Sequence, residues 1–410
     1  MPDAQPHQLF EFLAAYTDQV LAFNLAGPKP PALKPVSDAE RAAFIARTAR
    51  LAAGSGAQSL VLVGLGSGEI AAQLKAVLPH TEFLICEPSP QRARDALAQG
   101  QFLNASQAPL APLLADASPR ALWLLARGIL AGKKFITCLN PELPEAETAP
   151  GRTLQRLLEF HPQEAPAKAQ QDPPELPGQT LSLYAIVHPE EPDLAEFLAR
   201  LPPWLAEVVL LWDAAAPPDA ARVLGDACPA PVRHAARPLA GDFAAQRNYA
   251  LSLCASAWII SLDADERLSP QAWEALRAEI TAPRARAYLL PRLTLYPDDR
   301  HFRMGYGLWP DPQLRLFARD AAASYINPVH EILTGFAGNP ALLPHCSIIH
   351  LSYVLKDRAT LAERLAVFDQ ALGRETHRLN ETFPHLPLTW HEAWLRHIHD
   401  LDFLPLLLKV

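Results

Sequence analysis

The sequence predicts an α/β protein with two domains, followed by helices at its C-terminal end. Strand-like and helix-like patterns alternate over residues 57–138, and the same alternation returns from about residue 180 after a proline-rich stretch. At 410 residues, the chain exceeds the roughly 100–200 residues of one ordinary domain. With 50% hydrophobic and 20% charged residues, its composition is that of a globular protein.

The first domain begins with two predicted helices, residues 8–24 and 38–53, which we expect to cover a parallel sheet. "SLVLVGLGSG" predicts a buried strand that enters a glycine-rich turn, and "EIAAQLKAVL" predicts the helix after it. "TEFLICEPSP" predicts a second strand that ends at Glu87. This order of elements is typical of a Rossmann-like domain.

A stretch rich in proline and glutamate lies between about residues 139 and 180, and it keeps no apolar periodicity. We therefore predict a first domain over 1–160, a linker over 161–179, a second α/β domain over 180–355 and a helical extension over 356–410.

The second domain repeats the alternation of strands and helices. "LSLYAIVH", "EVVLLWD" and "AWIISLDAD" predict strands, whereas "EPDLAEFLARL" and "FAAQRNYALSLC" predict helices between them. Two amphipathic faces then predict the final helices. Their apolar members are Leu361, Leu365, Phe368 and Leu372 in the first and Trp394, Leu395, Ile398 and Leu401 in the second.

Charge and cysteine content exclude several classes of protein. The net charge is −8 and no block of Lys and Arg is present, so nucleic acid is not expected as a partner. Five scattered cysteines, none in a CxxC spacing, argue against a disulfide framework or a zinc site. We expect a cytoplasmic protein, because there is no signal-like segment and no apolar run long enough to span a membrane.

The apolar tail "LDFLPLLLKV" leaves two interpretations open. It either packs on the core as a last helix, which is the commoner case, or touches the inner face of a membrane or a partner.

Two carboxylates, Asp263 and Asp265, directly follow the buried strand "WIISL". Open α/β sheets bind ligands at the carboxyl ends of their strands. Oxygen ligands there suit Mg²⁺ or Mn²⁺, which would act as a Lewis acid on a departing diphosphate. The pair therefore predicts transfer from a nucleotide-activated donor; the alternative is a solvated turn in which aspartate caps the next helix.

Other motifs surround this pair in a fixed order. Asp213 ends the strand "VVLLWD", and Arg247 and Asn248 stand in "RNYA"; "LDADE", "WPDPQLRLF" and "VHE" follow. Together they resemble the family-2 glycosyltransferases of GT-A fold, in particular the bacterial subgroup that builds lipopolysaccharide core and related surface glycans. The resemblance covers roughly residues 180–355.

The resemblance implies a role for each matched residue. Asp213 would contact the nucleoside, Asp263 the ribose or the metal, and Asp265 the metal and the diphosphate. Arg247 would lie near the diphosphate or brace the loop of the two aspartates, and Asn248 would belong to the same donor site. An inverting transfer to a surface glycan or glycoprotein is implied as well.

Displacement at an anomeric carbon also requires a base for the acceptor hydroxyl. We choose Glu331 of "VHE" over Asp311, since Asp311 could instead cap a turn. His330 and His350 are either metal or phosphate ligands or structural residues at strand ends, with His350 as the expected metal ligand. Tyr306 and Trp309 predict either a sugar-stacking platform or packing against the aspartate loop.

The resemblance is incomplete in the nucleoside-binding loops. The family's Asn-Glu and Gly-Ser-x-Asp runs are replaced by "AIVHPEEPDL" and "WDAAAPPDAA". Glu190, Glu191 or Asp219 could substitute for the missing contacts, so the sequence does not identify the donor.

The glycine-rich turn of the first domain presents a second candidate site. Gly64, Gly66 and Gly68 precede Glu87 by about 20 residues, which is the spacing of a dinucleotide or S-adenosylmethionine pocket. The turn resembles those of class I methyltransferases and of the motility-accessory proteins linked to flagellin glycosylation. No catalytic methyltransferase motif follows, and "LNPEL" is a poor substitute for one.

The sequence leaves three hypotheses. The first is a metal-dependent glycosyltransferase, and the second is a bifunctional enzyme that also transfers methyl groups from S-adenosylmethionine. The third is a non-catalytic scaffold with a degenerate donor site. For the first domain alone, a working nucleotide pocket and a retained scaffold for a partner or acceptor remain equal alternatives.

Overall fold

The computed structural model describes residues 6–23, 29–100, 111–159, 180–363, 366, 382–398 and 404–405. The chain divides into two compact units. Unit 1 comprises Met1–Ala165, Arg303–Pro310 and Phe383–Leu401, and unit 2 comprises Pro166–Phe302, Asp311–Thr382 and Asp402–Val410.

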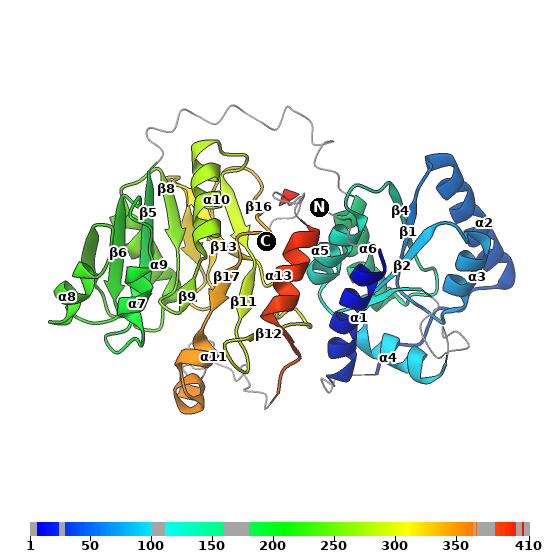
Figure 1. The fold of residues 1–410 in the computed structure, drawn as a ribbon, viewed down its shortest axis with the longest axis horizontal. Helices are drawn as coiled ribbons and strands as arrows, with labels where there is room; N and C mark the ends of the chain where they lie inside the picture. Colours follow the sequence, from blue (N-terminus) through cyan, green and yellow to red (C-terminus); the bar gives the residue numbers. More distant parts are fainter. Residues whose placement is uncertain are drawn as a thin grey trace. The chain divides into compact units, whose positions relative to one another are not determined.

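Unit 1 contains a four-stranded parallel sheet in the order β3-β2-β1-β4. Figure 1 labels β2, β1 and β4 of this sheet. The strands are β1 (Ser59–Val63), β2 (Glu82–Glu87), β3 (Leu113–Ala115) and β4 (Phe135–Leu139). The helices are α1 (Pro6–Ala22), α2 (Asp38–Ser55), α3 (Glu69–Val77), α4 (Pro90–Ala98), α5 (Pro119–Leu130) and α6 (Glu145–Glu159). All five residues of β1 are buried, as expected of a central parallel strand.

Short local signals fix where these helices begin. Ser37 caps α2 in a reciprocal capping box with Glu40. Ser89 and Ser118 cap α4 and α5, and a proline directly after each serine occupies the first turn. The same Ser-Pro start recurs at Ser269 before α10 (Pro270–Thr281) in unit 2.

Two later segments of the chain complete unit 1. Trp309 is fully buried and packs edge-on against Trp394 of α13 (Leu388–His397), with ring centroids 5.1 Å apart. Tyr16 of α1 and Trp390 of α13 pack against the same indole. The Tyr306 hydroxyl lies 2.9 Å from the carbonyl oxygen of Val20 in α1. Aromatic packing thus attaches these segments to α1.

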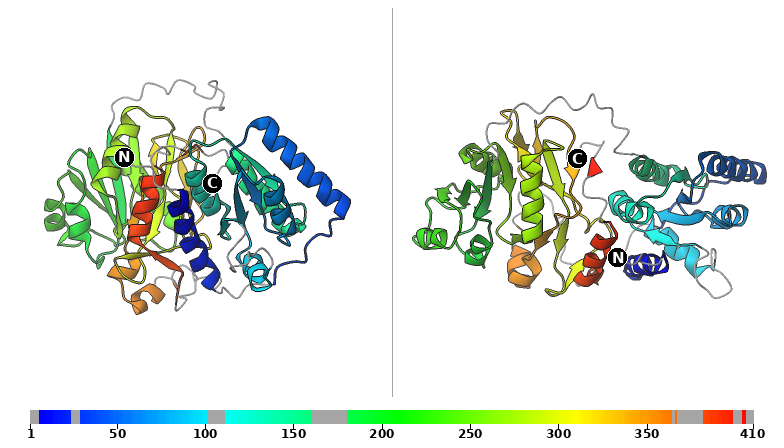
Figure 2. Two further views of the ribbon diagram at one scale, coloured as in Figure 1. Left: turned by 45° about the vertical axis from the view of Figure 1, so that its right-hand side comes forward. Right: turned by 45° about the horizontal axis from the view of Figure 1, so that its top comes forward.

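Unit 2 is built on an eight-stranded mixed sheet in the order β19-β16-β10-β13-β8-β5-β6-β7. The parallel part contains β5 (Leu181–Val187), β6 (Glu207–Trp212), β7 (Val232–Ala236) and β8 (Trp258–Ser261). The remaining strands are β10 (Ala287–Leu290), β13 (Gln313–Ala318), β16 (Ala341–Leu342) and β19 (Leu404–Pro405), with β13 antiparallel to both β8 and β10. Helices α7 (Leu194–Ala199), α8 (Ala221–Asp226), α9 (Phe243–Leu253) and α10 belong to this unit, which Figure 2 shows from two further directions.

The sheet of unit 2 is buried on both faces. Along β5, Leu183 joins one hydrophobic cluster, with Trp258 and Trp273, whereas Tyr184 joins another, with Ile259 and Phe317. This division follows from the alternation of side chains along a strand.

Short elements surround the end of β8. A three-stranded sheet places β17 (Ile348–His350) between β11 (Arg292–Thr294) and β9 (Glu266–Arg267), and α11 (Ser352–Leu355) follows β17. The strands β14 (Ser324–Ile326) and β15 (Ile332–Thr334) form an antiparallel pair. The remaining short strands are β12 (His301–Arg303) and β18 (His385–Pro387).

The predicted fold class is confirmed: the chain has a parallel α/β sheet near its N-terminus and a large mixed α/β sheet after it. The domain boundaries stay predictions, and the linker 161–179 lies outside the described residues. The same applies to Leu365, Phe368 and Leu372, and to most of the apolar tail. Within the described ranges, no helix has both the length and the apolar character needed to cross a membrane.

Candidate functional site

The two aspartates lie in a tight, anchored loop at the carboxyl end of β8. The backbone N–H of Leu262 donates to the Tyr184 carbonyl of β5 at 3.2 Å, and the Glu266 N–H donates to the Asp263 carbonyl at 2.9 Å. The Leu351 N–H donates to the Asp265 carbonyl at 2.8 Å, which ties the loop to the end of β17. The predicted position at the carboxyl end of a buried strand is therefore the one observed.

Asp263 is held by two arginines. Its Oδ1 lies 3.2 Å from Nη2 of Arg247, and its Oδ2 lies 2.9 Å from Nη2 of Arg315. Burial disfavours the charged carboxylate, but Arg315 and Arg247 outweigh that effect and hold the pKa of Asp263 well below its usual range. Asp263 is therefore a carboxylate at every physiological pH.

Arg247 joins this aspartate to the predicted base. From α9, its Nε donates to Oε1 of Glu331 at 2.5 Å, and its Nη1 donates to the Ser261 hydroxyl at 2.8 Å. The guanidinium is buried, which favours its neutral form, yet Asp263 and Glu331 raise its pKa well above the ordinary value. Arg247 thus contacts the loop of the two aspartates, as expected of a side chain that braces this loop, which is one of the two roles that the resemblance implies.

Asp265 has a different set of side-chain partners, which come from the end of β17 and the segment directly after it. Its Oδ2 accepts a hydrogen bond from the Ser352 hydroxyl at 2.6 Å and forms a short ion pair with the Lys356 ammonium. His350 Nε2 lies 3.7 Å from the same oxygen. Burial opposes ionisation of Asp265, but His350 and Lys356 lower the pKa of its carboxyl well below the usual range.

Sequence reasoning missed two cations of this site. Arg315 belongs to the motif "WPDPQLRLF", so the motif marks its position but not its pairing with the carboxylates. Lys356 lies one residue beyond the predicted end of the second domain at residue 355, and no local pattern marks it. Both side chains are buried, and buried cations need carboxylate partners.

The two candidate bases are both paired with arginine. Asp311 Oδ2 lies 2.8 Å from Nε and 2.6 Å from Nη2 of Arg292, and its Oδ1 accepts from the Gln313 amide at 2.8 Å. Asp311 also has a φ of 40°, in the left-handed region that side chains rarely adopt. Glu331 pairs with Arg247, which also pairs with Asp263 in the loop of residues 263–266, called the DAD loop below. Arg292, the partner of Asp311, reaches the same loop at Glu266, whose Oε1 lies 3.8 Å from Nη1.

The other predicted donor residues are distributed over unit 2. Asp213, at the end of β6, accepts the Leu239 N–H at 2.7 Å. The Asn248 amide forms two hydrogen bonds with the backbone of Tyr325, at 2.8 and 2.7 Å, and thereby clamps α9 to β14. Both polar ends of Asn248 are thus engaged by the fold, and Asp219 is exposed in the loop before α8.

The two histidines of the prediction and the glutamates of the loop after β5 have different surroundings. His350 Nδ1 lies 3.0 Å from the Thr294 hydroxyl, which orients the ring with Nε2 toward Asp265. His330 is exposed and has a φ of 54°. Glu190 is exposed, whereas Glu191 Oε1 lies 3.4 Å from Lys356 Nζ.

The sugar-stacking prediction for Tyr306 and Trp309 needs correction. Trp309 has no exposed surface and is enclosed by Tyr16, Trp390 and Trp394 within unit 1, so it offers no face to a sugar. Tyr306 directs its hydroxyl to the backbone at the end of α1. Trp309 therefore belongs to the aromatic core of unit 1, whereas the half-buried Tyr306 is held by its hydroxyl against the end of α1.

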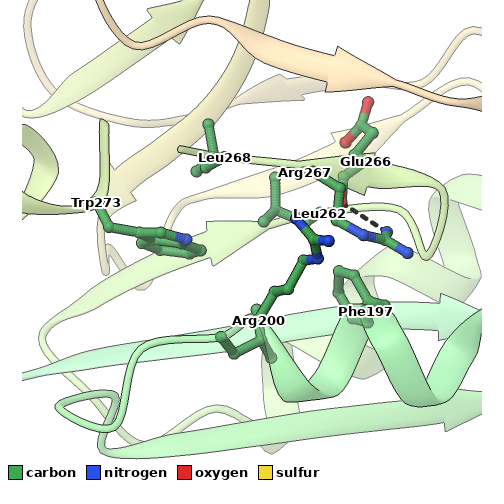
Figure 3. Close-up of a pocket in the computed structure, with 8 residues that line it drawn as sticks. Phe197, Arg200, Leu262, Glu266, Arg267, Leu268 and Trp273 are labelled. Carbon is green, nitrogen blue, oxygen red and sulfur yellow. Dashed lines mark hydrogen bonds between the residues drawn. The ribbon is translucent and has the colours of Figure 1, made fainter. Parts of the chain in front are cut away.

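A small cavity lies beside the loop that follows β8 (Figure 3). Arg267 lines this cavity. Its Cζ lies 5.2 Å from the centre of the Phe197 ring, and its Nη2 lies 2.9 Å from Oδ2 of Asp193. The cavity encloses about 10 Å³, room for about one water molecule. Its lining consists of Phe197, Arg200, Leu201, Leu262, Glu266, Arg267, Leu268 and Trp273. A nucleotide cannot occupy this space.

The carboxylates do not fit a divalent ion in the arrangement described. Asp265 and His350 lie close enough to share an ion, but the facing oxygen of Asp265 already accepts from Ser352 and Lys356. Both oxygens of Asp263 face arginines. Among the residues whose placement is described, no cluster of three or more His, Cys, Asp or Glu side chains could hold a metal.

In unit 1, the residues of the predicted nucleotide pocket form hydrogen bonds with other groups of the protein, and the pocket stays a prediction. The Glu87 carboxylate is fully buried and accepts hydrogen bonds from the backbone N–H groups of Leu65 and Ser89, each at 2.7 Å. Burial raises the pKa of Glu87 to about 7, although these two hydrogen bonds lower it. A ribose would have to compete with the loop's own backbone for this carboxylate.

The glycine-rich turn faces the segment "LNPEL". Glu142 of that segment accepts from the Ser67 N–H at 2.7 Å and from the Ser67 hydroxyl at 2.9 Å. A side-chain carbon on Gly66 would lie 2.3 Å from Glu142 Oε2, and one on Gly64 would lie 2.6 Å from Leu143. Gly68, with a φ of 86°, caps α3. The glycines thus admit Glu142 and Leu143 against the turn.

A match to a known protein family lies within unit 2, apart from the segment 303–310. Residues 182–343 match the family model described as "Glycosyl transferase family 2". This region is a family-2 glycosyltransferase domain. It contains β5, the DAD loop, Arg315 and Glu331, and it confirms the glycosyltransferase that the sequence predicts for the C-terminal half. His350 and Lys356 lie just beyond the matched region.

Individual relatives match the chain over limited lengths. A TPR repeat-containing protein of Synechococcus elongatus is 43% identical over 53 residues, which is 13% of each chain. A structure of S. aureus TarS 1-349 covers 28% of this chain and 36% of its own, at 16% identity and a TM-score of 0.24. TarS 1-349 in complex with UDP-GlcNAc covers 54% and 73%, at 11% identity and a TM-score of 0.32. Similarity this low says nothing about the substrates of the family-2 domain in this chain.

Proposed function

We propose that the family-2 domain transfers a sugar from a nucleotide-sugar donor to a hydroxyl group of a surface glycan or glycoprotein, with inversion at the anomeric carbon. The observation that supports this proposal best is the path from Asp263 through Arg247 to Glu331. One buried guanidinium fixes the position of a predicted base relative to the strand end where the donor diphosphate is expected.

In this transfer, the acceptor oxygen forms a bond to the anomeric carbon while the bond from that carbon to the diphosphate oxygen breaks. The acceptor proton passes to the carboxylate of Glu331, and the diphosphate leaves with the bonding electron pair. Arg247 is a positioning residue, because its hydrogen bond to Oε1 leaves the second oxygen of Glu331 to accept the proton. Asp311 is the alternative base, held in the same manner by Arg292.

The resemblance also implies Mg²⁺ or Mn²⁺, and metal dependence stays a prediction. Asp263, Asp265 and His350 are the residues that the sequence assigns to the ion. The contacts of Asp265 with Lys356 and Ser352 favour a side chain as the source of positive charge.

The test is a donor screen followed by a matched pair of variants. Purified protein is mixed with UDP-, GDP-, CMP- and dTDP-sugars, with and without Mn²⁺, and binding is followed by calorimetry. With the donor that binds, Glu331→Gln should keep its affinity and lose on the order of 10²–10⁴-fold in kcat, whereas Asp311→Asn should not. Equal kcat for Glu331→Gln and wild type would exclude Glu331 as the base.

For unit 1, we propose that it serves as a scaffold that binds a partner protein or the acceptor. The Glu142 carboxylate at the glycine-rich turn supports this function, because it takes the donors that a nucleotide phosphate would need. The bifunctional methyltransferase remains the alternative. Saturable binding of S-adenosylmethionine that Glu87→Ala abolishes would favour that alternative.

We also propose a cytoplasmic location, with peripheral membrane contact through the C-terminal tail. Because the tail lies largely outside the described residues, the support is its apolar sequence alone. Binding of the full chain to anionic vesicles, compared with a chain that ends at residue 400, tests the membrane contact.

A further inference from the structure

We propose that the ammonium group of Lys356, in place of a divalent cation, binds the diphosphate of the donor at the end of β8. The proposal rests on the proposed glycosyl transfer and specifies how the same site neutralises the leaving group. It predicts that a nucleoside diphosphate binds without any metal ion.

The position of Lys356 is the first argument. Its Nζ forms a short ion pair with Asp265, the second aspartate of the DAD loop, and lies 3.4 Å from Oε1 of Glu191 and 3.5 Å from the Ser352 hydroxyl. Glu191 belongs to the loop after β5, and Asp265 to the loop after β8, which is the parallel neighbour of β5. The ammonium therefore lies between the carboxyl ends of two adjacent parallel strands, where α/β sheets bind phosphates.

The burial of Lys356 is the second argument. Its side chain is only 2% exposed, and lysine is seldom buried unless it is paired. The fold thus holds the amino group of Lys356 beside the DAD loop through contacts of its own. A helix cap or a solvated turn would not require this charge.

The third argument is that the two aspartates have few oxygens left for a metal ion. Arg247 and Arg315 take one oxygen each of Asp263, and Ser352 and Lys356 share Oδ2 of Asp265. Displacing Lys356 would leave a desolvated ammonium beside an incoming dication, which is electrostatically unfavourable. These contacts are those of a site whose cation is already supplied.

The contact with Glu191 indicates how the diphosphate would enter. An ammonium has three N–H donors, and here they face Asp265, Ser352 and Glu191. Of the two carboxylate contacts, the one with Glu191 is the longer. A phosphate oxygen could replace Glu191 while the pair with Asp265 is kept.

The deciding experiment is calorimetric titration of the full chain with UDP, GDP, CDP and dTDP in excess EDTA, and again with Mn²⁺. We expect at least one nucleoside diphosphate to bind in EDTA with an affinity that Mn²⁺ changes by less than about threefold. Manganese paramagnetic resonance should detect no ion bound together with that nucleotide. Lys356→Met should weaken binding in EDTA by about ten- to a hundredfold, the usual effect of a lost charge-assisted contact.

Two further variants control the result. Lys356→Arg keeps the charge and should retain most of the affinity, whereas Lys134→Met removes an exposed lysine and should behave as wild type. Binding only with Mn²⁺, or wild-type binding by folded Lys356→Met, would overturn the role of Lys356 and leave the transferase intact. Failure of every nucleoside diphosphate under both conditions would overturn the proposed function as well. The wild-type titration in EDTA decides even if Lys356→Met does not fold.

Discussion

Replacement of Arg247 by methionine should destabilise unit 2 by about 3–5 kcal/mol, the usual cost of removing one partner from a buried ion pair. Arg247 is buried and donates to Glu331, Ser261 and Asp263. Each such bond to a charged group contributes about 1.5–3 kcal/mol, but the three are not additive because Asp263 keeps Arg315. Glu331, with 16% of its side chain exposed, recovers only part of its hydration.

Native-state hydrogen exchange of the β8 and α9 amides measures this effect, since the two units need not unfold together. Arg247→Lys should recover part of the loss, because one ammonium cannot reproduce the fork of a guanidinium. Arg200→Met is the matched control: its pair with Glu196 is exposed, and such pairs contribute little. Exchange in Arg247→Met that matches wild type would refute the view that this guanidinium holds the site together.

Three further predictions concern other parts of the molecule. Burial raises the pKa of Glu87 to about 7, so the free energy of unfolding of unit 1 should decrease as pH rises from about 4.5 to 7. Denaturant titrations should show a smaller decrease with pH in Glu87→Gln. Part of the decrease should remain in this variant, because burial also raises the pKa of Asp116 to about 6. Glu191→Gln should tighten nucleoside diphosphate binding in calorimetry, because it removes the anion that competes for Lys356. Trp309→Ala should destabilise unit 1 by about 3–5 kcal/mol, and a thermal melt equal to that of wild type would contradict its place in the core.

The elements that the sequence predicts well are those specified by local patterns. The apolar runs "SLVLV", "LSLYAIV" and "WIIS" mark β1, β5 and β8. The position of the DAD loop follows from the same signals, because it directly continues a buried strand. Such features depend on residues a few positions apart, which a single sequence displays.

The predictions that were wrong concern residues whose position depends on contacts between distant parts of the chain. Trp309 stands two residues before Asp311, and sequence proximity suggested a shared site. Its ring instead packs with Tyr16, almost 300 residues earlier, and with Trp390 and Trp394. Periodicity cannot reveal such pairing, because any buried surface of suitable shape accepts an indole.

The DAD loop shows why a motif predicts where chemistry occurs better than how it occurs. Its two aspartates look equivalent in sequence, yet Asp263 faces Arg247 and Arg315 whereas Asp265 faces Lys356. Each carboxylate acquires its function from cations that come from other elements. In our proposals, the arginines of Asp263 link the loop to the base Glu331, and Lys356 beside Asp265 supplies the positive charge for the departing diphosphate. Replacing either aspartate would therefore leave a different cation unpaired, and the two replacements should not be treated as one perturbation of a single metal site.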